Sequence, residues 1–202
     1  MVLMPDYTII CLCNKGYIQV HGFSSPRLNI FQLDPPADIN DIEMCYGKHI
    51  EGVPTEYAIA TDNGLYFISH LVGGNYSINQ LSDPIHRSSD KIKCLSVIRE
   101  NIFLLGVHGC QDLVIFDRLK RKDLLKVQNV SESGAYVAIK QIYPKGQELQ
   151  WNLFVIKDQD KVSLVAIDLE RRTLQNLDLA QIKGAWCQRD CLEVEWEERD
   201  IK

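Results

Sequence analysis

Alanine is scarce in this sequence of 202 residues, and long hydrophobic runs are absent. There are 8 alanines against 21 isoleucines and 14 valines. Alanine favours helices and β-branched side chains favour strands, so the composition predicts a chain that is mostly β. The longest apolar runs, residues 9–13 and 102–105, fit buried strands. They are far shorter than the roughly 20 residues that cross a bilayer, so we expect no membrane insertion.

A strong charge of one sign is also lacking. The chain has 22 Lys and Arg residues and 27 Asp and Glu residues, giving a net charge of −5. Hydrophobic residues make up 46% and charged residues 24%, which excludes disordered, collagen-like and coiled-coil chains. The mild acidity argues against nucleic acid as the main partner. The apolar start is interrupted by Asp6 before a signal-peptide core develops, so we expect no export signal.

Motifs of catalytic and nucleotide-binding sites are missing from the sequence. It contains neither Gly-x-Ser-x-Gly nor His-Glu-x-x-His, which mark serine hydrolases and zinc proteases. The pair Gly73-Gly74 lies in an expected loop with no helix behind it, whereas a phosphate-binding loop needs a helix N-terminus. We therefore expect no catalytic residues, no cofactor and no enzymatic activity.

Seven cysteines are present, an odd number, so at least one has no partner within the chain. Most lie in apolar runs, where a free cysteine behaves as a small hydrophobic residue. Together with the lack of an export signal, this predicts a reducing intracellular compartment, the cytoplasm or the nucleus.

Potential metal ligands occur as three short pairs: Cys11 and Cys13, His108 and Cys110, and Cys187 and Cys191. A structural zinc site needs two suitably spaced pairs close together. The first pair alternates along one strand, so both side chains share a face and fit a core. The last pair has no partner pair of suitable spacing. We therefore expect no metal site.

A hairpin pattern recurs four times along the chain. Each copy is an apolar strand, a tight polar turn rich in Asx and Gly, and a second apolar strand. The residues that precede the second strand are Gly16, Gly64, Asp112 and Lys161. They lie 48, 48 and 49 residues apart, and such a constant period indicates a repeat architecture.

Further strands flank each hairpin. A half-polar strand follows every copy, and another strand precedes the last three copies, whereas none is expected before the first. Four antiparallel strands in about 48 residues are typical of a β-propeller blade. The sequence thus predicts an all-β fold and one domain, 1–202. The expected blade-like units are 7–34, 39–82, 92–130 and 136–179, followed by a closing or extra strand at 191–197.

Three segments carry a more specific pattern. Residues 61–68 read Thr-Asp-Asn-Gly-Leu-Tyr-Phe-Ile, a tight turn and a strand, while 113–118 and 165–169 contain Phe-Asp and Ile-Asp at a strand end. These segments resemble WD-repeat β-propellers, in which the third strand of a blade ends in Trp-Asp. No Trp-Asp occurs here and no Gly-His precedes a first strand, so the family's Asp–His–Ser–Trp hydrogen-bond network is incomplete. Residues 56–66 also look like the related citron-homology-like propellers.

Two modes of closure are compatible with the repeat. If the strand at 191–196 pairs beside residues 9–13, the two ends of the chain complete one blade and close a four-bladed ring without open edges. Alternatively, the chain is a partial or open propeller, because the WD-repeat resemblance implies seven blades and about 300 residues.

The resemblance implies a protein-interaction scaffold, a propeller subunit of an intracellular multiprotein complex. Its partners are other proteins, and we expect one of them to complete the open edge of a sheet. Hairpin turns and the loops between blades share one rim, and the basic links between third and fourth strands share the other. Candidate partner-binding residues are His86, Arg87, His108, Gln111 and Asp158 on the first rim, and Lys120, Arg121, Lys122, Arg171 and Arg172 on the second.

The alternative is a small propeller enzyme or a ligand binder that uses the central channel. Such a site requires inward-facing polar side chains at the starts of the first strands of the blades. Those strands begin with Ile39, Ile92 and Tyr136, so we expect no shared polar set in the channel.

Overall fold

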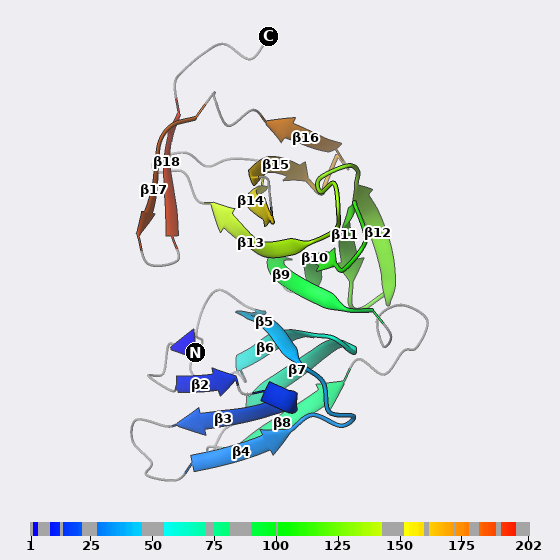
Figure 1. The fold of residues 1–202 in the computed structure, drawn as a ribbon, viewed down its shortest axis with the longest axis vertical. Coiled ribbons are helices and arrows are strands. Elements are labelled where there is room, and N and C mark those ends of the chain that lie inside the picture. Colours follow the sequence, from blue (N-terminus) through cyan, green and yellow to red (C-terminus); the bar gives the residue numbers. More distant parts are fainter. Residues whose placement is uncertain are drawn as a thin grey trace.

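Strands make up nearly all of the regular structure in the computed structural model. It describes residues 2–3, 9–12, 14–21, 28–45, 55–71, 75–80, 90–99, 101–142, 152–159, 162–171, 173–177, 182–188 and 191–196. They form four antiparallel sheets of four strands and one sheet of two strands (Figure 1). Across this part of the chain we find no helix of the length and apolarity that a membrane span needs.

Each four-stranded sheet is one blade, and its strands follow one another in sequence order. Blade 1 comprises β1 (Val2–Leu3), β2 (Ile9–Leu12), β3 (Tyr17–His21) and β4 (Leu28–Gln32), with a 3-10 turn, η1 (Asn14–Gly16), between β2 and β3. Blade 2 comprises β5 (Ile39–Met44), β6 (Thr55–Thr61), β7 (Gly64–Leu71) and β8 (Asn75–Gln80). Blade 3 comprises β9 (Ile92–Arg99), β10 (Ile102–Val107), β11 (Leu113–Asp117) and β12 (Lys122–Val127). Blade 4 comprises β13 (Tyr136–Ile142), β14 (Asn152–Asp158), β15 (Val162–Asp168) and β16 (Thr173–Leu177). The two-stranded sheet comprises β17 (Ile182–Gln188) and β18 (Cys191–Trp196).

The predicted all-β propeller architecture with about four blades is confirmed, and of the two modes of closure the described sheets agree with the open propeller and not with the four-bladed ring. The strand β18 pairs with β17, its neighbour in sequence, and not with β2. The inner edge of β2 is occupied by β1, which was not expected, through the pairs Val2↔Ile10 and Leu3↔Ile9. A local hairpin closes a shorter loop than a pairing between chain ends, and its entropic cost is correspondingly lower. The sheets described are therefore not closed into a four-bladed ring.

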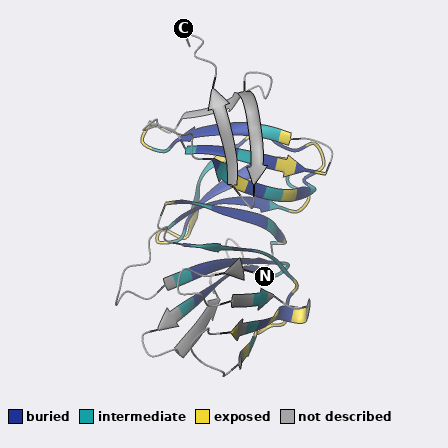
Figure 2. Ribbon diagram, turned by 90° about the vertical axis from the view of Figure 1, so that its left-hand side faces the viewer, coloured by how far each residue is buried: buried dark blue, intermediate teal, exposed yellow. Residues whose placement is uncertain are grey.

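The middle strands of the blades form the core, as Figure 2 shows by their dark blue colour. In blade 3, every residue of β11 and the first five residues of β10 are buried. Both faces of a middle strand pack on neighbouring blades, which explains the continuous apolar runs of the sequence. At the seam between blades 2 and 3, the rings of Phe67 and Phe103 meet edge to face with centroids 5.6 Å apart.

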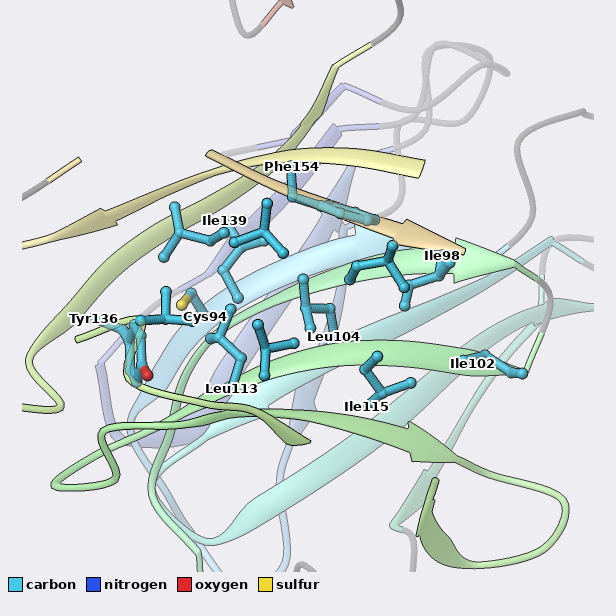
Figure 3. Packing of buried hydrophobic residues seen from close by; sticks show 14 residues of the cluster. Cys94, Ile98, Ile102, Leu104, Leu113, Ile115, Tyr136, Ile139 and Phe154 are labelled. Atoms are coloured by element: carbon cyan, nitrogen blue, oxygen red, sulfur yellow. The ribbon is translucent and has the colours of Figure 1, made fainter. Parts of the chain in front are cut away.

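Blades 3 and 4 join through a second apolar cluster (Figure 3). Leu104 and Ile115 from blade 3 pack with Ile139 and Phe154 from blade 4. Gly106 is required at this seam, because a Cβ atom there would lie 2.6 Å from the Cys94 sulfur. The first strands β5, β9 and β13 consequently lie one beside the next through the middle of the molecule (Figure 1).

Candidate interaction surfaces

The turns between the second and third strands form one rim of the molecule. In blade 2, Asp62 and Asn63 make a two-residue turn closed by the pair Thr61↔Gly64, and Gly64 adopts a φ of 105°. The buried Thr61 hydroxyl donates to the Gly64 carbonyl at 2.8 Å and accepts from the Asn63 N–H at 3.0 Å. The sequence thus fixes this turn locally through a threonine and a glycine.

An equivalent backbone hydrogen bond is found on this rim in three blades. A turn N–H donates to the carbonyl of the residue before the first strand: Asp62 to Asp38 at 3.0 Å, His108 to Lys91 at 2.8 Å, and Gln159 to Ala135 at 3.2 Å. The turns and the ends of the inter-blade segments therefore share one rim, as expected, and each turn is held by its own blade.

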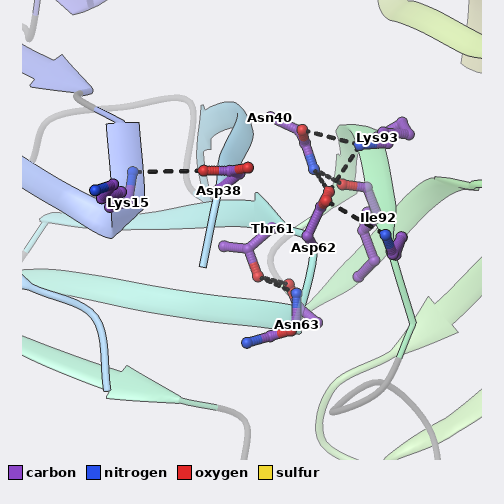
Figure 4. Close-up of polar contacts among 10 residues, drawn as sticks. Lys15, Asp38, Asn40, Thr61, Asp62, Asn63, Ile92 and Lys93 are labelled. Carbon is purple, nitrogen blue, oxygen red and sulfur yellow. Dashed lines mark hydrogen bonds and ion pairs between the residues drawn. The ribbon is translucent and has the colours of Figure 1, made fainter. Parts of the chain in front are cut away.

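An ion-pair network crosses from blade 2 to blade 3 on this rim (Figure 4). The Asp62 carboxylate lies 2.7 Å from the Lys93 ammonium, 3.8 Å from that of Lys91, and 2.8 Å from the donating Asn40 amide. The same amide donates to the Ile92 carbonyl at 2.8 Å. Burial alone raises the pKa of the Asp62 carboxyl, but the bonds from Asn40 and Lys93 and the two lysine charges outweigh it and lower the pKa.

The predicted residues of this rim have different surroundings. His108 and Gln111 are exposed in one turn of blade 3. The Gln111 side chain donates to the Glu132 carbonyl at 2.8 Å, so this turn is held by the segment that leads to blade 4. Asp158 is only 4% exposed and accepts a hydrogen bond from the Ser131 hydroxyl, so its carboxylate supports the rim from within. His86 and Arg87 lie outside the described residues.

The turns between the third and fourth strands form the opposite rim. In blade 3 the Asp117 carboxylate accepts from the Lys120 N–H at 3.0 Å and lies 3.3 Å from the Lys120 ammonium. In blade 4 Asp168 accepts from the N–H groups of Glu170 and Arg171 at 2.9 and 3.0 Å. These aspartates follow Phe116 and Ile167, the positions that resemble Trp-Asp, and their role here is to cap the turn.

Most of the predicted basic residues are exposed on this opposite rim. The structure brings Lys120, Arg121 and Lys122 together at one turn of blade 3, and it places Arg171 at the matching turn of blade 4. The Lys120 and Arg171 side chains are 63% and 66% exposed. Arg172 lies outside the described residues.

Arg118 differs from these neighbours because its charge is used within the fold. Its guanidinium pairs with the Glu56 carboxylate of blade 2 through two hydrogen bonds, one of 2.9 Å, and lies 3.7 Å from the centre of the Phe67 ring. The Ser69 hydroxyl also donates to Glu56, at 3.3 Å. Arg118 thus fastens blade 3 to blade 2 on the rim opposite Asp62.

Two carboxylates of β5 lie between the first strands of blades 2 and 3. Asp41 accepts from the Leu95 N–H at 3.0 Å, and Glu43 accepts from the Val97 N–H at 3.1 Å and the Ser96 hydroxyl at 3.3 Å. They satisfy N–H groups on the edge of β9 that β10 leaves unpaired. The Asp41 and Glu43 side chains thereby connect β5 with β9, two first strands that belong to different sheets.

Burial raises the pKa of the Glu43 carboxyl to about 7, although its bonds from Ser96 and Val97 lower it. Burial also raises the pKa of Asp41, while the Leu95 N–H and the Lys140 ammonium of β13 lower it. The expectation of no shared polar set concerned the starts of the first strands, Ile39, Ile92 and Tyr136, and so missed Asp41 and Glu43 further along β5. The alternation of Asp41 and Glu43 in an expected inner strand was the signal in the sequence, because side chains two residues apart share a face.

Metal-binding geometry is not found among the residues that the structure describes: no three His, Cys, Asp or Glu side chains converge. Cys11, Cys45, Cys94 and Cys110 are free thiols. Cys13 lies outside the described residues, and Cys187 and Cys191 are described only in their backbone.

The fold has counterparts among solved structures. The β-propeller domain of Cps50 (Swd1) from Myceliophteria thermophila superposes with a TM-score of 0.59 at 11% identity, over 86% of this chain and 56% of that one. A protein of unknown function from Bacteroides caccae superposes with a TM-score of 0.51 at 12% identity, over 88% of this chain and 59% of that one. The WD40 domain of SCAP from fission yeast gives a TM-score of 0.48 at 13% identity, over 96% of this chain and 49% of that one.

The first likeness confirms the expected β-propeller fold, and identities this low show the fold alone. The chain spans a little over half the length of the first two structures. No protein-family model and no curated protein matches the sequence.

Proposed function

We propose that this chain is a non-enzymatic protein-interaction scaffold, a propeller subunit of a multiprotein complex in the cytoplasm or nucleus. Its partners are other proteins, which bind the exposed turns of the two rims. The predicted contact residues in the described part that are exposed there are His108, Gln111, Lys120, Arg121, Lys122 and Arg171.

The observation that carries the proposal is the way blade 2 is fastened to blade 3. Polar contacts cross this seam on one rim at Asp62, in the middle at Asp41 and Glu43, and on the other rim at Arg118. Between them lies the apolar cluster around Phe67 and Phe103. A seam held at three levels keeps the turns on both rims in fixed positions, and a fixed surface loses little entropy when it binds a partner.

The proposal also accounts for the open arrangement of sheets. The last sheet has two strands where each blade has four, and the sheets described do not close into a ring. An unpaired strand edge readily accepts a strand from elsewhere. We infer that a partner subunit pairs with an open edge of the described sheets.

The test is purification of the tagged chain from cells at its natural level, followed by size-exclusion chromatography with light scattering. We expect one or more proteins to stay with it in a fixed ratio at high salt, at a mass above that of the chain. Elution as a free monomer of 23.1 kDa from every extract and salt condition would contradict the scaffold role.

A second function, ligand binding in the central channel, is favoured by one observation. Asp41, Glu43, Ser96 and Lys140 bring polar groups together between the first strands, and the pKa of Glu43 near 7 is typical of functional carboxylates. The hydrogen bonds that Asp41 and Glu43 accept from the β9 backbone favour a structural role instead. Native mass spectrometry of the purified chain decides: a stoichiometric small molecule that is lost in Glu43→Gln supports the channel function.

A further inference from the structure

We propose that the turn between β11 and β12 is a docking point for an acidic segment of a partner protein that presents one apolar side chain. This inference rests on the proposed scaffold function and names the chemistry of one partner. We call residues 117–122 the blade-3 turn.

The first observation is an exposed leucine at the tip of the blade-3 turn. Leu119 is 76% exposed, more than any other large hydrophobic residue among those described; Ile30 follows at 57%. Exposed single apolar residues are common, but this one lies in a turn between two charged neighbours, Arg118 and Lys120. An apolar side chain in that place offers contact area that a partner removes from water.

The second observation is the sign of the charges around the leucine. The strand register places Arg99, Ile102, Asp117 and Lys122 in one row across the end of blade 3. Among the described residues of this end, the exposed charged side chains are Arg99, Lys120, Arg121 and Lys122, and all of them are cationic. Asp117 is buried and caps the turn. An acidic segment is complementary to this surface, although the whole chain is acidic.

The third observation is that the blade-3 turn is already fixed. The Asp117 carboxylate holds the Lys120 N–H, and the Arg121 N–H donates to the Arg118 carbonyl at 3.3 Å. The Arg118 N–H donates to the Asn101 carbonyl at 2.9 Å, while its guanidinium is held by Glu56. The tip therefore cannot fold back onto its own blade, and binding costs little ordering.

The matching turn of blade 4 shows that folding does not require an exposed leucine. Asp168 caps that turn in the same way as Asp117 caps the blade-3 turn. One residue beyond the capping aspartate, Leu169 packs on the core, and the exposed Glu170 follows at the position of Leu119. A polar residue thus suits this position, so the turn does not need a leucine there in order to form.

A protein segment fits this surface better than a nucleic acid or a membrane does. Single-stranded nucleic acid is usually held by aromatic side chains that stack on bases, and the tip of the turn offers leucine instead. One leucine is too small an anchor for a membrane surface, which needs a larger apolar face.

The test measures binding of labelled peptide probes to the purified chain by fluorescence anisotropy. The first probe has one phenylalanine flanked by three glutamates on each side; in the second, glycine replaces the phenylalanine; in the third, lysines replace the glutamates. We expect the first probe to bind about tenfold more tightly than the second, because hot spots combine an apolar anchor with charged surroundings. We expect no binding of the third probe.

Variants then locate the site. Leu119→Ser should remove the preference for the phenylalanine probe, and Lys120→Glu with Lys122→Glu should abolish binding of both acidic probes. The control is Lys126→Glu, which reverses one lysine charge towards the other end of β12 and should bind as the wild type does. Unchanged binding by the Lys120/Lys122 variant, or tighter binding to anionic vesicles or single-stranded RNA than to the first probe, would overturn the proposal.

A second arm separates this inference from the scaffold function. The same variants are expressed in cells, and the complex is purified as described above. If the wild type holds partners and the Lys120/Lys122 variant loses one of them, both proposals stand. If the variant keeps all partners, the blade-3 turn is not the docking point but the scaffold function stands. If the wild type holds none, the scaffold function fails whatever the peptides show.

Discussion

At the scale of single residues, the buried carboxylates of β5 have the clearest energetic consequences. Glu43 accepts two hydrogen bonds from blade 3, yet burial raises the pKa of its carboxyl from 4.5 to about 7. The folded chain thus binds this proton more tightly than the unfolded chain does. By linkage, Glu43 stabilises the fold fully below pH 4.5, and this contribution is lost as the pH rises through 7.

The variant Glu43→Gln should therefore flatten the pH dependence of the free energy of unfolding between pH 4.5 and 7.5. At pH 8 we expect it to be more stable than the wild type by about 1–2 kcal/mol, since the cost of burying a charge is removed while one acceptor oxygen remains. Urea unfolding across this pH range measures the effect, with Glu132→Gln on an exposed loop as control. A slope as steep as that of the wild type would contradict the role given to Glu43.

A pair of glycines gives a second prediction at this scale. Both Gly109 and Gly134 have φ near +70°, and the Gly109 N–H donates to the Gly134 carbonyl at 3.1 Å. A Cβ atom on Gly134 would lie 2.5 Å from the Cys110 nitrogen, whereas one on Gly109 meets nothing within 4 Å. We expect Gly134→Ala to lower the free energy of unfolding by about 2–4 kcal/mol and Gly109→Ala by about 1 kcal/mol. Equal losses in urea unfolding would disprove the close approach.

At the scale of elements, the seam between blades 2 and 3 is held by charged contacts as well as by apolar packing. Arg118 leaves the end of β11 and reaches Glu56 at the start of β6, in the neighbouring blade. Both side chains are about one quarter exposed, at 23% and 26%. Geometry of this kind, with two parallel hydrogen bonds, makes an ion pair more effective than a typical surface pair.

A double-mutant cycle with Arg118→Met and Glu56→Gln tests this seam. We expect each single change to destabilise the chain and the pair to show a coupling energy of about 1 kcal/mol in urea unfolding. The pair formed by the exposed Arg171 and the buried Asp168 is 3.8 Å long and lies within one turn; it is the comparison and should couple less. Additive effects at Arg118 and Glu56 would mean that this ion pair does not help to hold the two blades together.

Much of the architecture could be predicted at this scale, because the hairpin turns carry their own signals. The turn at Asp62 and Asn63 is followed by Gly64, whose positive φ the turn requires. The constant spacing of such turns along the sequence predicted the four blades. β1 could not be predicted, since two residues are too few for a period of 2 to show. β17 was missed as well, because its sequence, Ile-Lys-Gly-Ala-Trp-Cys-Gln, mixes polar and small residues.

The candidate site was only partly predictable for a different reason. The exposure of Lys120, Lys122 and Arg171 follows from their place in turns, which the sequence shows. The burial of Asp158, the blade-to-blade bond of Arg118 and the contact of Asp41 and Glu43 with β9 join elements far apart in sequence. Such contacts depend on how blades pack, and no local pattern encodes that.

At the scale of the whole molecule, this chain is a row of propeller blades with fastened seams and exposed turns. Its fold agrees with a β-propeller domain of which it spans 56%. The blades are rigid where they meet, and the rims project charged and apolar side chains outward. The proposed scaffold role requires this arrangement: on binding, the solvent contact of the turns would change while the inner strands would stay as they are.

Hydrogen–deuterium exchange of the chain, alone and in its purified complex, tests this central claim most directly. The account predicts slower exchange in the complex at the rim turns, above all at residues 117–122, with exchange of the inner strands β5, β9 and β13 unchanged. Protection confined to β5, β9 and β13, with no change at any rim turn, would contradict the scaffold and point to a ligand in the central channel.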